Sequence, residues 1–246
     1  MAEPPEIELI RPDWPAPPNV RAFSTTRNGG FSRGPWSSLN LGKSCGDDPQ
    51  HVEQNRRLLF KLLPSEPRWL NQVHGTHVAD WDKTNEPATG ADAIVSRKPG
   101  QVCSVLTADC LPVLFCNRAG TRIAAAHAGW RGLAAGVLEA TVLAMQCRPA
   151  ELIAWLGPAI GPRAFEVGPD VYDAFVGLNP ENATAFKPHR DRWLADLYQL
   201  ARLALARVGI TQVSGGQHCT YLEQDRFFSY RRDGQTGRML TAVWLT

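Results

Sequence analysis

Long hydrophobic runs are missing from this 246-residue chain, which argues against a membrane protein. A membrane-spanning helix needs about 18 or more consecutive apolar residues, whereas the most apolar stretch here is interrupted by Asp109 and Pro112. The start, MAEPPEIELIRPDWPAPP, has acidic residues and prolines where an export signal has a basic start and an unbroken apolar stretch. We therefore expect a soluble, cytoplasmic protein with no membrane partner.

A large excess of one charge is also missing. The 26 lysines and arginines are nearly balanced by 24 aspartates and glutamates, which gives a formal net charge of +2, and they are scattered along the chain. A protein that binds DNA or RNA normally concentrates its basic residues in a patch or stripe. We therefore expect no nucleic-acid partner, and we expect any anion that the protein binds to be a small molecule. The sequence does not fix the oligomeric state, and a monomer is the expectation.

Cysteines are few and dispersed, at positions 45, 103, 110, 116, 147 and 219. In a chain of this length without an export signal, that pattern favours free thiols or metal ligands over a disulfide framework. Internal repeats and low-complexity linkers are absent from the sequence, so nothing marks a domain boundary. The proline-rich start predicts an extended arm over residues 1–19, and residues 20–246 are expected to form one domain.

Strand-like and helix-like segments are both present, without strict alternation. Apolar residues at helical spacing predict helices over three segments: 49–63, 131–146 and 191–208. Runs rich in Val, Ile, Leu and Cys, bounded by turn residues, predict strands at 20–26, 68–73, 77–81, 93–96, 102–106, 112–116, 122–126, 152–156, 227–230 and 241–245. The mixture predicts an α+β (mixed α/β) fold, with mixed β-sheets flanked by helices.

Three short segments place a metal-ligand residue at the end of a strand-like run, beside residues that break the strand. They are NQVHG with His74, LTADCLP with Cys110, and AAAHAGWRG with His127. Strand ends are where a rigid sheet holds side chains at the mouth of a cleft. Two imidazoles and one thiolate form a known catalytic zinc set that leaves one coordination position open.

The residues alone also allow a plainer interpretation. A cysteine between apolar runs is often a small buried hydrophobe, and a single histidine is often just hydrogen-bonded. The three residues are far apart in sequence, so no local spacing constrains them. His77, His218 and Cys219 are competing candidates.

Several longer motifs carry a family resemblance. The segments NQVHGTHV, GADAIVS, VLTADCLPVLF, AAAHAGWRGLAAGVLEATV, LGPAIGPRAFEVGPDV and SYRRDGQTGR together resemble the laccase-domain family typified by YfiH, from about Ser24 to Arg238. The family implies a zinc site of His, Cys and His, which the motifs assign to His74, Cys110 and His127. His77 departs from the residue that similar sequences often carry, and we do not expect it to be a ligand. The family fold resembles that of a deamidating bacterial toxin.

Residues beside the expected ligands are further candidates. Asp109 could orient a ligating histidine or carry a proton beside the metal, or it could be a turn carboxylate. The segment HAGWRG could present backbone N–H groups at the start of helix 131–146, with Arg131 nearby, as an anion site. Its glycines could equally serve a tight strand-to-helix turn. Trp130 is expected to fill the core.

Candidate substrate-binding residues lie in the flanking motifs. Arg27 in STTRNGGFS and Asn40 in SLNLG resemble the N-terminal motif of the family and could supply a charged fork and an amide, although solvated loop residues are the alternative for both. Of Arg231 and Arg232 in SYRRDG, one could reach the cleft while the other remains in water, with Arg231 as the candidate.

The resemblance implies purine nucleoside chemistry. Its expected reactions are phosphorolysis of adenosine, inosine, guanosine or methylthioadenosine, and deamination of adenosine. A conventional four-copper laccase needs many more histidines than the six present, and no His-x-His pair occurs, although copper could still occupy the site of two histidines and one cysteine.

Two other functions remain as alternatives. One is a cysteine hydrolase or an enzyme that edits peptidoglycan precursors, with Cys110 as nucleophile and His127 as its base. The other is a structural zinc or interaction module. Three protein ligands argue against that module, because closed structural sites normally use four.

Overall fold

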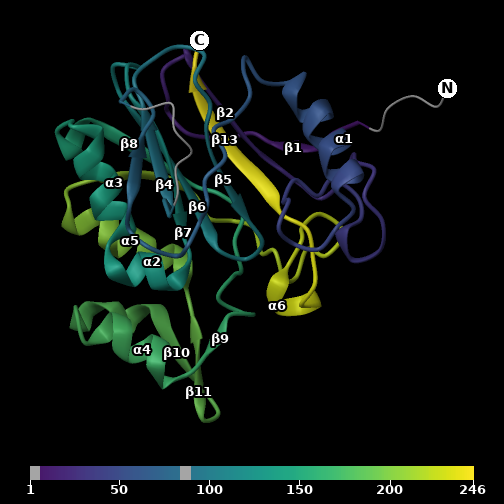
Figure 1. Ribbon diagram of the computed structural model, residues 1–246. Helices are drawn as coiled ribbons and strands as arrows, with labels where there is room; N and C mark the ends of the chain where they lie inside the picture. The colour runs from purple at the N-terminus through teal and green to yellow at the C-terminus, as the bar shows by residue number, and fades with distance from the viewer. Residues whose placement is uncertain (1–5, 84–89) are drawn as a thin grey trace.

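The computed structural model describes residues 6–83 and 90–246 as an α+β single domain (Figure 1). The strands are β1 Leu9–Ile10, β2 Val20–Thr25, β3 Val78–Asp80, β4 Ala93–Ser96, β5 Cys103–Thr107, β6 Leu111–Asn117, β7 Ile123–Ala128, β8 Leu152–Leu156, β9 Glu166–Val167, β10 Phe186–His189, β11 Arg192–Ala195, β12 Gln212–Gly215 and β13 Met239–Leu245. The helices are α1 Pro49–Phe60, α2 Trp130–Ala135, α3 Val137–Met145, α4 Pro169–Val176, α5 Leu197–Arg207 and α6 Tyr230–Asp233, with short 3₁₀ turns at Gly34–Trp36, Pro149–Glu151 and Pro180–Ala185.

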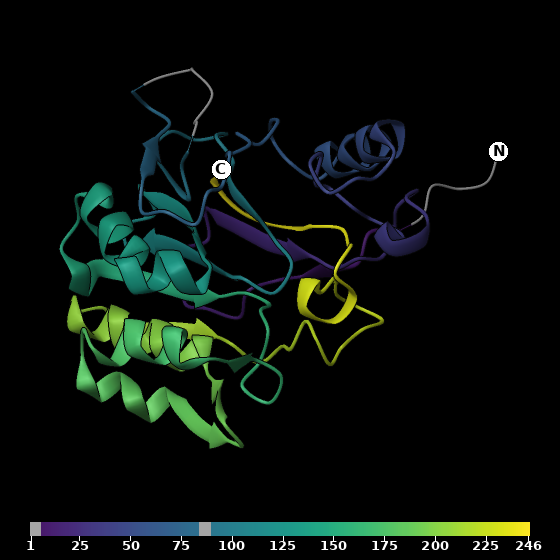
Figure 2. The ribbon, with the colours of Figure 1, turned by 60° about the horizontal axis from the view of Figure 1, so that its bottom comes forward.

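Three sheets organise the chain. A six-stranded mixed sheet has the order β12-β8-β6-β7-β4-β3, a four-stranded sheet the order β1-β2-β13-β5, and a small sheet the order β10-β11-β9. Figures 1 and 2 show α2, α3 and α5 on one side of the six-stranded sheet, while α1 lies beyond the four-stranded sheet. In both views α4 and the small sheet lie together at one end of the molecule.

The period of two along the central strands explains the layers. On β6, Val113 and Phe115 join the apolar cluster shared with the helices, whereas Leu114 and Cys116 join the cluster shared with β5 and β13. Side chains that alternate between two buried faces require apolar residues at every position, as in β6, where all seven residues are buried. The six-stranded sheet therefore lies between the helices and the four-stranded sheet.

Most predicted strands are confirmed, but two are wrong. Residues 68–73 form no strand, because the Gln72 side chain pairs with the backbone of Leu106: its Oε1 accepts from Leu106 N and its Nε2 donates to Leu106 O, both at 2.8 Å. Residues 227–230 also form no strand. Phe227 and Phe228 are fully buried in a small cluster with Met239, and α6 begins at Tyr230.

The predicted helices need three corrections. Helix 131–146 is two helices, α2 and α3, which meet at Gly136 with a left-handed φ of 98°. Helix 191–208 begins only at Leu197, where Asp196 caps it by accepting from Gln199 N, and the residues before it form β11. Helix 49–63 ends at Phe60.

Some elements were not predicted: β1, β9, β10, β11, β12, α4 and α6. Within residues 6–83 and 90–246, none of the helices has the length and apolar character needed to cross a membrane.

Candidate metal centre and active site

A cavity of about 990 Å³ opens beside the ends of β5, β6 and β7. Its wall contains the three predicted metal ligands, His74, Cys110 and His127. It also contains four aromatic side chains, Trp69, Trp130, Phe165 and Tyr230, and five cationic ones, Lys43, Arg56, Arg131, Arg231 and Arg238. Asp109 is the carboxylate among the lining residues. The cavity is therefore aromatic and positively charged beside the candidate metal site.

Strand pairing brings two of the three ligands together. His127 is the next-to-last residue of β7, and its register partner Pro112 is the second residue of β6, two positions after Cys110. His74 comes from the loop between α1 and β3. His74 is 36 positions from Cys110 and 53 positions from His127 in the sequence. The three side chains nevertheless meet beside the ends of β6 and β7, as expected for side chains at strand ends.

The ligand atoms of His74, Cys110 and His127 lie within 4.8 Å of one another. His74 Nε2 is 3.7 Å from Cys110 Sγ, and the two imidazole rings meet edge to face with centroids 4.8 Å apart. Zn–S and Zn–N bonds of about 2.3 and 2.0–2.1 Å at tetrahedral angles separate sulfur from nitrogen by about 3.6 Å. The donor set and the 3.7 Å between His74 Nε2 and Cys110 Sγ are compatible with one metal ion held by these three residues.

Asp92 links two of these ligands and was missed by the sequence analysis. Its fully buried carboxylate accepts from the backbone N of Val73, His74 and Gly75 at 3.1, 2.9 and 2.7 Å. It also bonds His127 Nδ1 at 2.7 Å. Asp92 lies in GADAIVS, one of the motifs of the resemblance, but nothing in its local sequence predicts a partner 35 residues away.

The electrostatics of the metal-free protein favour an ion pair between a Cys110 thiolate and a protonated His127. Burial opposes the Cys110 thiolate, but His127 and His74 outweigh it and lower the pKa of Cys110 to about 6. Burial likewise opposes charge on His127, but Cys110 and Asp92 raise the pKa of His127 to about 9. Burial also works against ionisation of Asp92, yet the bonds from His127, Gly75 and Val73 lower its pKa. A thiolate serves equally as a metal ligand or as a nucleophile.

Because Gly129 has no side chain, the side chains of His74 and Cys110 can lie close to its backbone. A Cβ atom at this position would lie 2.7 Å from His74 Cδ2 and 3.0 Å from Cys110 Sγ. Both distances are far below ordinary van der Waals contact. Glycine in HAGWRG therefore serves close packing around the candidate metal site, in addition to preceding α2.

Asp109 holds the C-terminal segment and does not contact a ligating histidine through its carboxylate. Its Oδ1 accepts from the Thr220 hydroxyl at 2.6 Å, and its Oδ2 accepts from the Ser229 hydroxyl and Arg231 N at 3.0 and 2.7 Å. Its backbone has a φ of 88°, immediately before Cys110. The contacts of Asp109 thus tie the Cys110 turn to the segment that carries Arg231.

The predicted substrate-binding arginines separate into two groups. Arg131 and Arg231 line the cavity. The Arg131 guanidinium lies over the Trp130 ring at 4.4 Å, and Arg231 Nη1 donates to Glu166 O at 2.6 Å. Arg27 is not among the lining residues, and its guanidinium donates to two backbone carbonyls in neighbouring loops.

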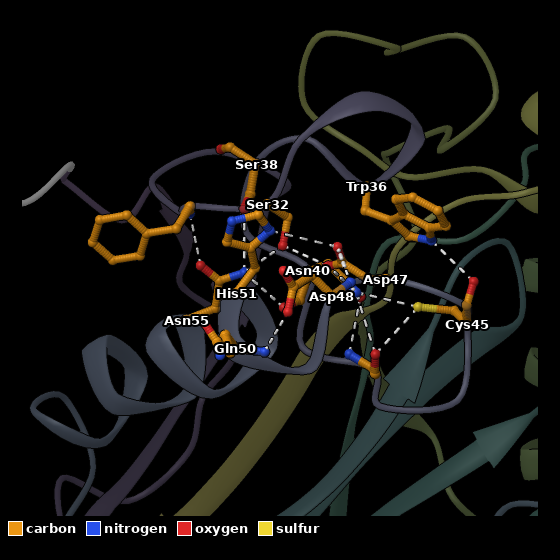
Figure 3. Close-up of polar contacts among 12 residues, drawn as sticks. Ser32, Trp36, Ser38, Asn40, Cys45, Asp47, Asp48, Gln50, His51 and Asn55 are labelled. Atoms are coloured by element: carbon orange, nitrogen blue, oxygen red, sulfur yellow. Dashed lines mark hydrogen bonds and ion pairs between the residues drawn. The ribbon is translucent and has the colours of Figure 1, made fainter.

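Asn40 is also absent from the cavity lining and lies in a buried polar network (Figure 3). Its Nδ2 donates to Asp47 Oδ2 at 2.9 Å and contacts Cys45 Sγ at 3.2 Å, and its Oδ1 accepts from Arg238 N at 2.9 Å. Cys45 and Arg238 do line the cavity. Asn40 thus does not face the cavity itself, and it holds together the loops that carry Cys45 and Arg238.

The competing ligand candidates lie outside the ligand group in the described part of the chain. His218 Nδ1 lies 3.2 Å from Glu223 Oε2, and Cys219 Sγ accepts from Gly161 N at 3.2 Å. His77 is exposed.

Arg232 and Trp130 differ in their relation to the cavity. Arg232 donates to backbone carbonyls at 2.8–2.9 Å and is not a lining residue. Trp130 lines the cavity and also packs against the core.

Comparison with known proteins agrees with these motifs. The family model described as multi-copper polyphenol oxidoreductase laccase matches residues 21–246. A protein of Escherichia coli (strain K12) named purine nucleoside phosphorylase YfiH is 58% identical over 242 residues, which cover 97% of this chain and 99% of the relative. A Pseudomonas aeruginosa protein, also named a purine nucleoside phosphorylase, is 55% identical over 96% of this chain and 98% of its own length.

Solved structures give the same result. A crystal structure of a Neisseria meningitidis protein matches with a TM-score of 0.93 and 54% identity, covering 96% of this chain and 98% of that one. YlmD from Geobacillus stearothermophilus matches with a TM-score of 0.89 and 32% identity, covering 99% of both chains. The chain therefore belongs to the multi-copper polyphenol oxidoreductase laccase family, the laccase-domain family of YfiH.

Proposed function

We propose that this chain is a zinc-dependent purine nucleoside phosphorylase that acts on adenosine, inosine, guanosine and methylthioadenosine, and that it also deaminates adenosine. The names of the Escherichia coli and Pseudomonas aeruginosa relatives support the phosphorylase activity. The observation that carries the proposal is the His74, Cys110 and His127 set in the wall of an aromatic, cationic cavity. Small-molecule substrates are thus the proposed partners.

One metal site supports this chemistry better than oxidation by four coppers. His74, Cys110 and His127 are the group of metal-ligand residues that the described part of the chain brings together, whereas a laccase needs a separate three-copper cluster. A zinc ion held by them would act as a Lewis acid and lower the pKa of a bound water toward 7. Copper fits the same donors, and zinc is proposed because two imidazoles and one thiolate with an open position form a known catalytic zinc set.

The cationic wall supplies a place for phosphate. The guanidinium groups of Arg56, Arg231 and Arg238 donate hydrogen bonds to backbone carbonyls. Arg131 stacks on Trp130 and has no protein hydrogen-bond acceptor among the described residues, so its N–H groups remain available for a bidentate contact with a phosphate. We assign Arg131 the main phosphate contact, with Lys43 as a second charge.

The aromatic wall suits a purine. Trp69 and Phe165 are stacked by arginines, with centroid distances of 3.5 Å to Arg56 and 5.3 Å to Arg231. Tyr230 is 62% exposed at the cavity and offers a free ring face.

In phosphorolysis, a phosphate oxygen bonds to C1′ of the ribose as the C1′–N9 bond breaks, so the base leaves with a proton. The protein's part is to hold the two substrates in line.

The test is product analysis with zinc-loaded protein. With phosphate, adenosine, inosine and guanosine should each give the free base and ribose 1-phosphate, and methylthioadenosine should give adenine and 5-methylthioribose 1-phosphate. Adenosine without phosphate should give inosine and ammonia. Both reactions should stop when the metal is removed and return when zinc is restored. Absence of both products from fully loaded protein, across all four nucleosides, would refute the proposal.

A second candidate function has one observation in its favour. Cys110, His127 and Asp92 have the connectivity of a nucleophile, a base and an orienting carboxylate, since Asp92 bonds His127 Nδ1 and leaves Nε2 for the thiol. This arrangement suits a cysteine hydrolase or a peptidoglycan-precursor editing enzyme. Full hydrolytic activity without metal, lost on alkylation of Cys110, would favour it over the zinc enzyme.

A further inference from the structure

The contacts of Asp92 join the loop of one metal ligand to the ring of another. Its two carboxylate oxygens each accept two hydrogen bonds: Oδ1 from His74 N and His127 Nδ1, and Oδ2 from Val73 N and Gly75 N. The side chain is fully buried, whereas His74 and Val73 are exposed. We propose that Asp92 is a positioning residue that sets the geometry of the metal ligands before the metal binds, an inference that rests on the proposed metal site.

The first consequence concerns His127. Both Asp92 oxygens accept hydrogen bonds from backbone N–H groups, so at 2.7 Å from Oδ1 the Nδ1 of His127 acts as the donor and carries a proton. The neutral ligand form then presents the Nε2 lone pair toward Cys110 and His74. Fixing the tautomer and the ring plane of a ligating histidine in this way is a common task of a neighbouring carboxylate in zinc sites.

The second consequence concerns His74. Its backbone has a φ of 61°, a left-handed conformation that is uncommon for residues with a side chain. Three successive backbone N–H groups, from Val73 to Gly75, converge on Asp92, which forms the concave anion-binding turn called a nest. The carboxylate thus stabilises the one loop conformation that turns the His74 ring toward Cys110 Sγ, 3.7 Å away.

The same residue therefore determines the position of one ligand and the tautomer of another. Asparagine at position 92 has almost the same shape, but one of its two polar atoms is a donor. In Asp92→Asn, one amide oxygen must replace both carboxylate oxygens, so at least two of the four donors lose their acceptor. A matched control is Asp80→Asn, which removes a carboxylate that accepts from Arg97 at 3.0–3.1 Å, outside the cavity lining.

The experiment measures zinc affinity by competition with a chelator and records the absorption spectrum of the Co²⁺-substituted protein. Loss of an orienting partner of a metal ligand typically weakens metal binding by about 10- to 100-fold. We expect that loss for Asp92→Asn, together with an altered thiolate-to-cobalt band, and wild-type values for Asp80→Asn. Equal zinc affinity and equal spectra for Asp92→Asn and wild type would overturn the inference.

A measurement on the metal-free wild-type protein covers the case in which Asp92→Asn does not fold. The amides of Val73, His74 and Gly75 belong to a loop whose first two residues are exposed, so Asp92 is the acceptor that can protect them from hydrogen exchange. Slow exchange of all three supports the inference, whereas exchange at the rate of free amides overturns it. Zinc affinity and amide exchange need no nucleoside, so missing phosphorolysis with these results intact would refute the proposed function alone.

Discussion

Gly129→Ala tests whether the candidate metal site depends on the close approach of the HAGWRG turn. Gly129 has φ and ψ of −59° and 153°, a region that alanine adopts readily, so the substitution carries no backbone penalty. The added methyl carbon would instead lie 2.7 Å from His74 Cδ2 and 3.0 Å from Cys110 Sγ. Ordinary contacts begin at 3.4 Å, so His74 must move by about 0.7 Å or the turn must move away.

That displacement is large compared with the tolerance of a metal site. Zinc–ligand distances vary by only about 0.2 Å between well-formed sites, so a ring displaced by several times that amount cannot keep its bond. Removing an orienting partner already weakens metal binding by up to about 100-fold. We therefore expect zinc affinity to fall by at least about 100-fold, or about 2.8 kcal/mol. Overpacking should destabilise the fold by only about 1–3 kcal/mol.

The assay compares Gly129→Ala with Gly75→Ala, a glycine in the His74 loop itself. A Cβ atom at Gly75 meets its nearest neighbours at 3.6 Å, an ordinary contact, and Gly75 does not have a left-handed φ. Zinc per chain after dialysis against a chelator, circular dichroism and phosphorolysis rate are measured for both. Gly129→Ala should be folded, zinc-poor and inactive, and Gly75→Ala zinc-loaded. Full zinc retention by Gly129→Ala would refute the steric argument.

Three further predictions follow from the same site. His74→Ala should lose its zinc and most activity but keep its circular dichroism spectrum, whereas the exposed His77→Ala should keep all three. Arg131→Ala should raise the KM for phosphate at least about 10-fold and spare deamination, while Arg27→Ala, whose guanidinium bonds backbone carbonyls, should change both reactions equally; the reverse pattern would contradict the assignment of the phosphate contact. In metal-free protein, alkylation of Cys110 should rise as pH increases through about 6, since the thiolate forms above its lowered pKa; zinc should suppress alkylation, and a midpoint near 9 would refute the ion pair.

The sequence predicts the inner strands of the two large sheets well because their apolar runs are continuous and bounded by turn residues, and it misses the edge strands β1 and β12. It fails where a local pattern serves a different contact. Phe227 and Phe228 have the composition of a strand, yet the chain there packs as a buried loop and then turns into α6. Gly136 interrupts an otherwise helical pattern, which periodicity alone cannot distinguish from a tolerated helical glycine.

The candidate ligands were found through motifs, whereas the residues that hold them depend on tertiary contacts. For Asp109 the sequence leaves open an orienting carboxylate, a proton carrier or a turn carboxylate. Its oxygens bond Thr220, Ser229 and Arg231 N, and the carboxylate that contacts His127 is Asp92. Adjacency in sequence does not make a side chain point the same way, and along an extended strand neighbours point to opposite faces.

Backbone strain gives an independent argument for the location of the site. Four non-glycine residues among those described have a positive φ, and two of them are His74 itself and Asp109, which precedes Cys110. Such conformations cost about 1–3 kcal/mol each and persist only where surrounding contacts hold them. Here each strained residue lies beside a buried carboxylate with several donors: Asp92 for His74, and its own side chain for Asp109. The Asp92 and Asp109 carboxylates thus stabilise the two turns that bring His74 and Cys110 together.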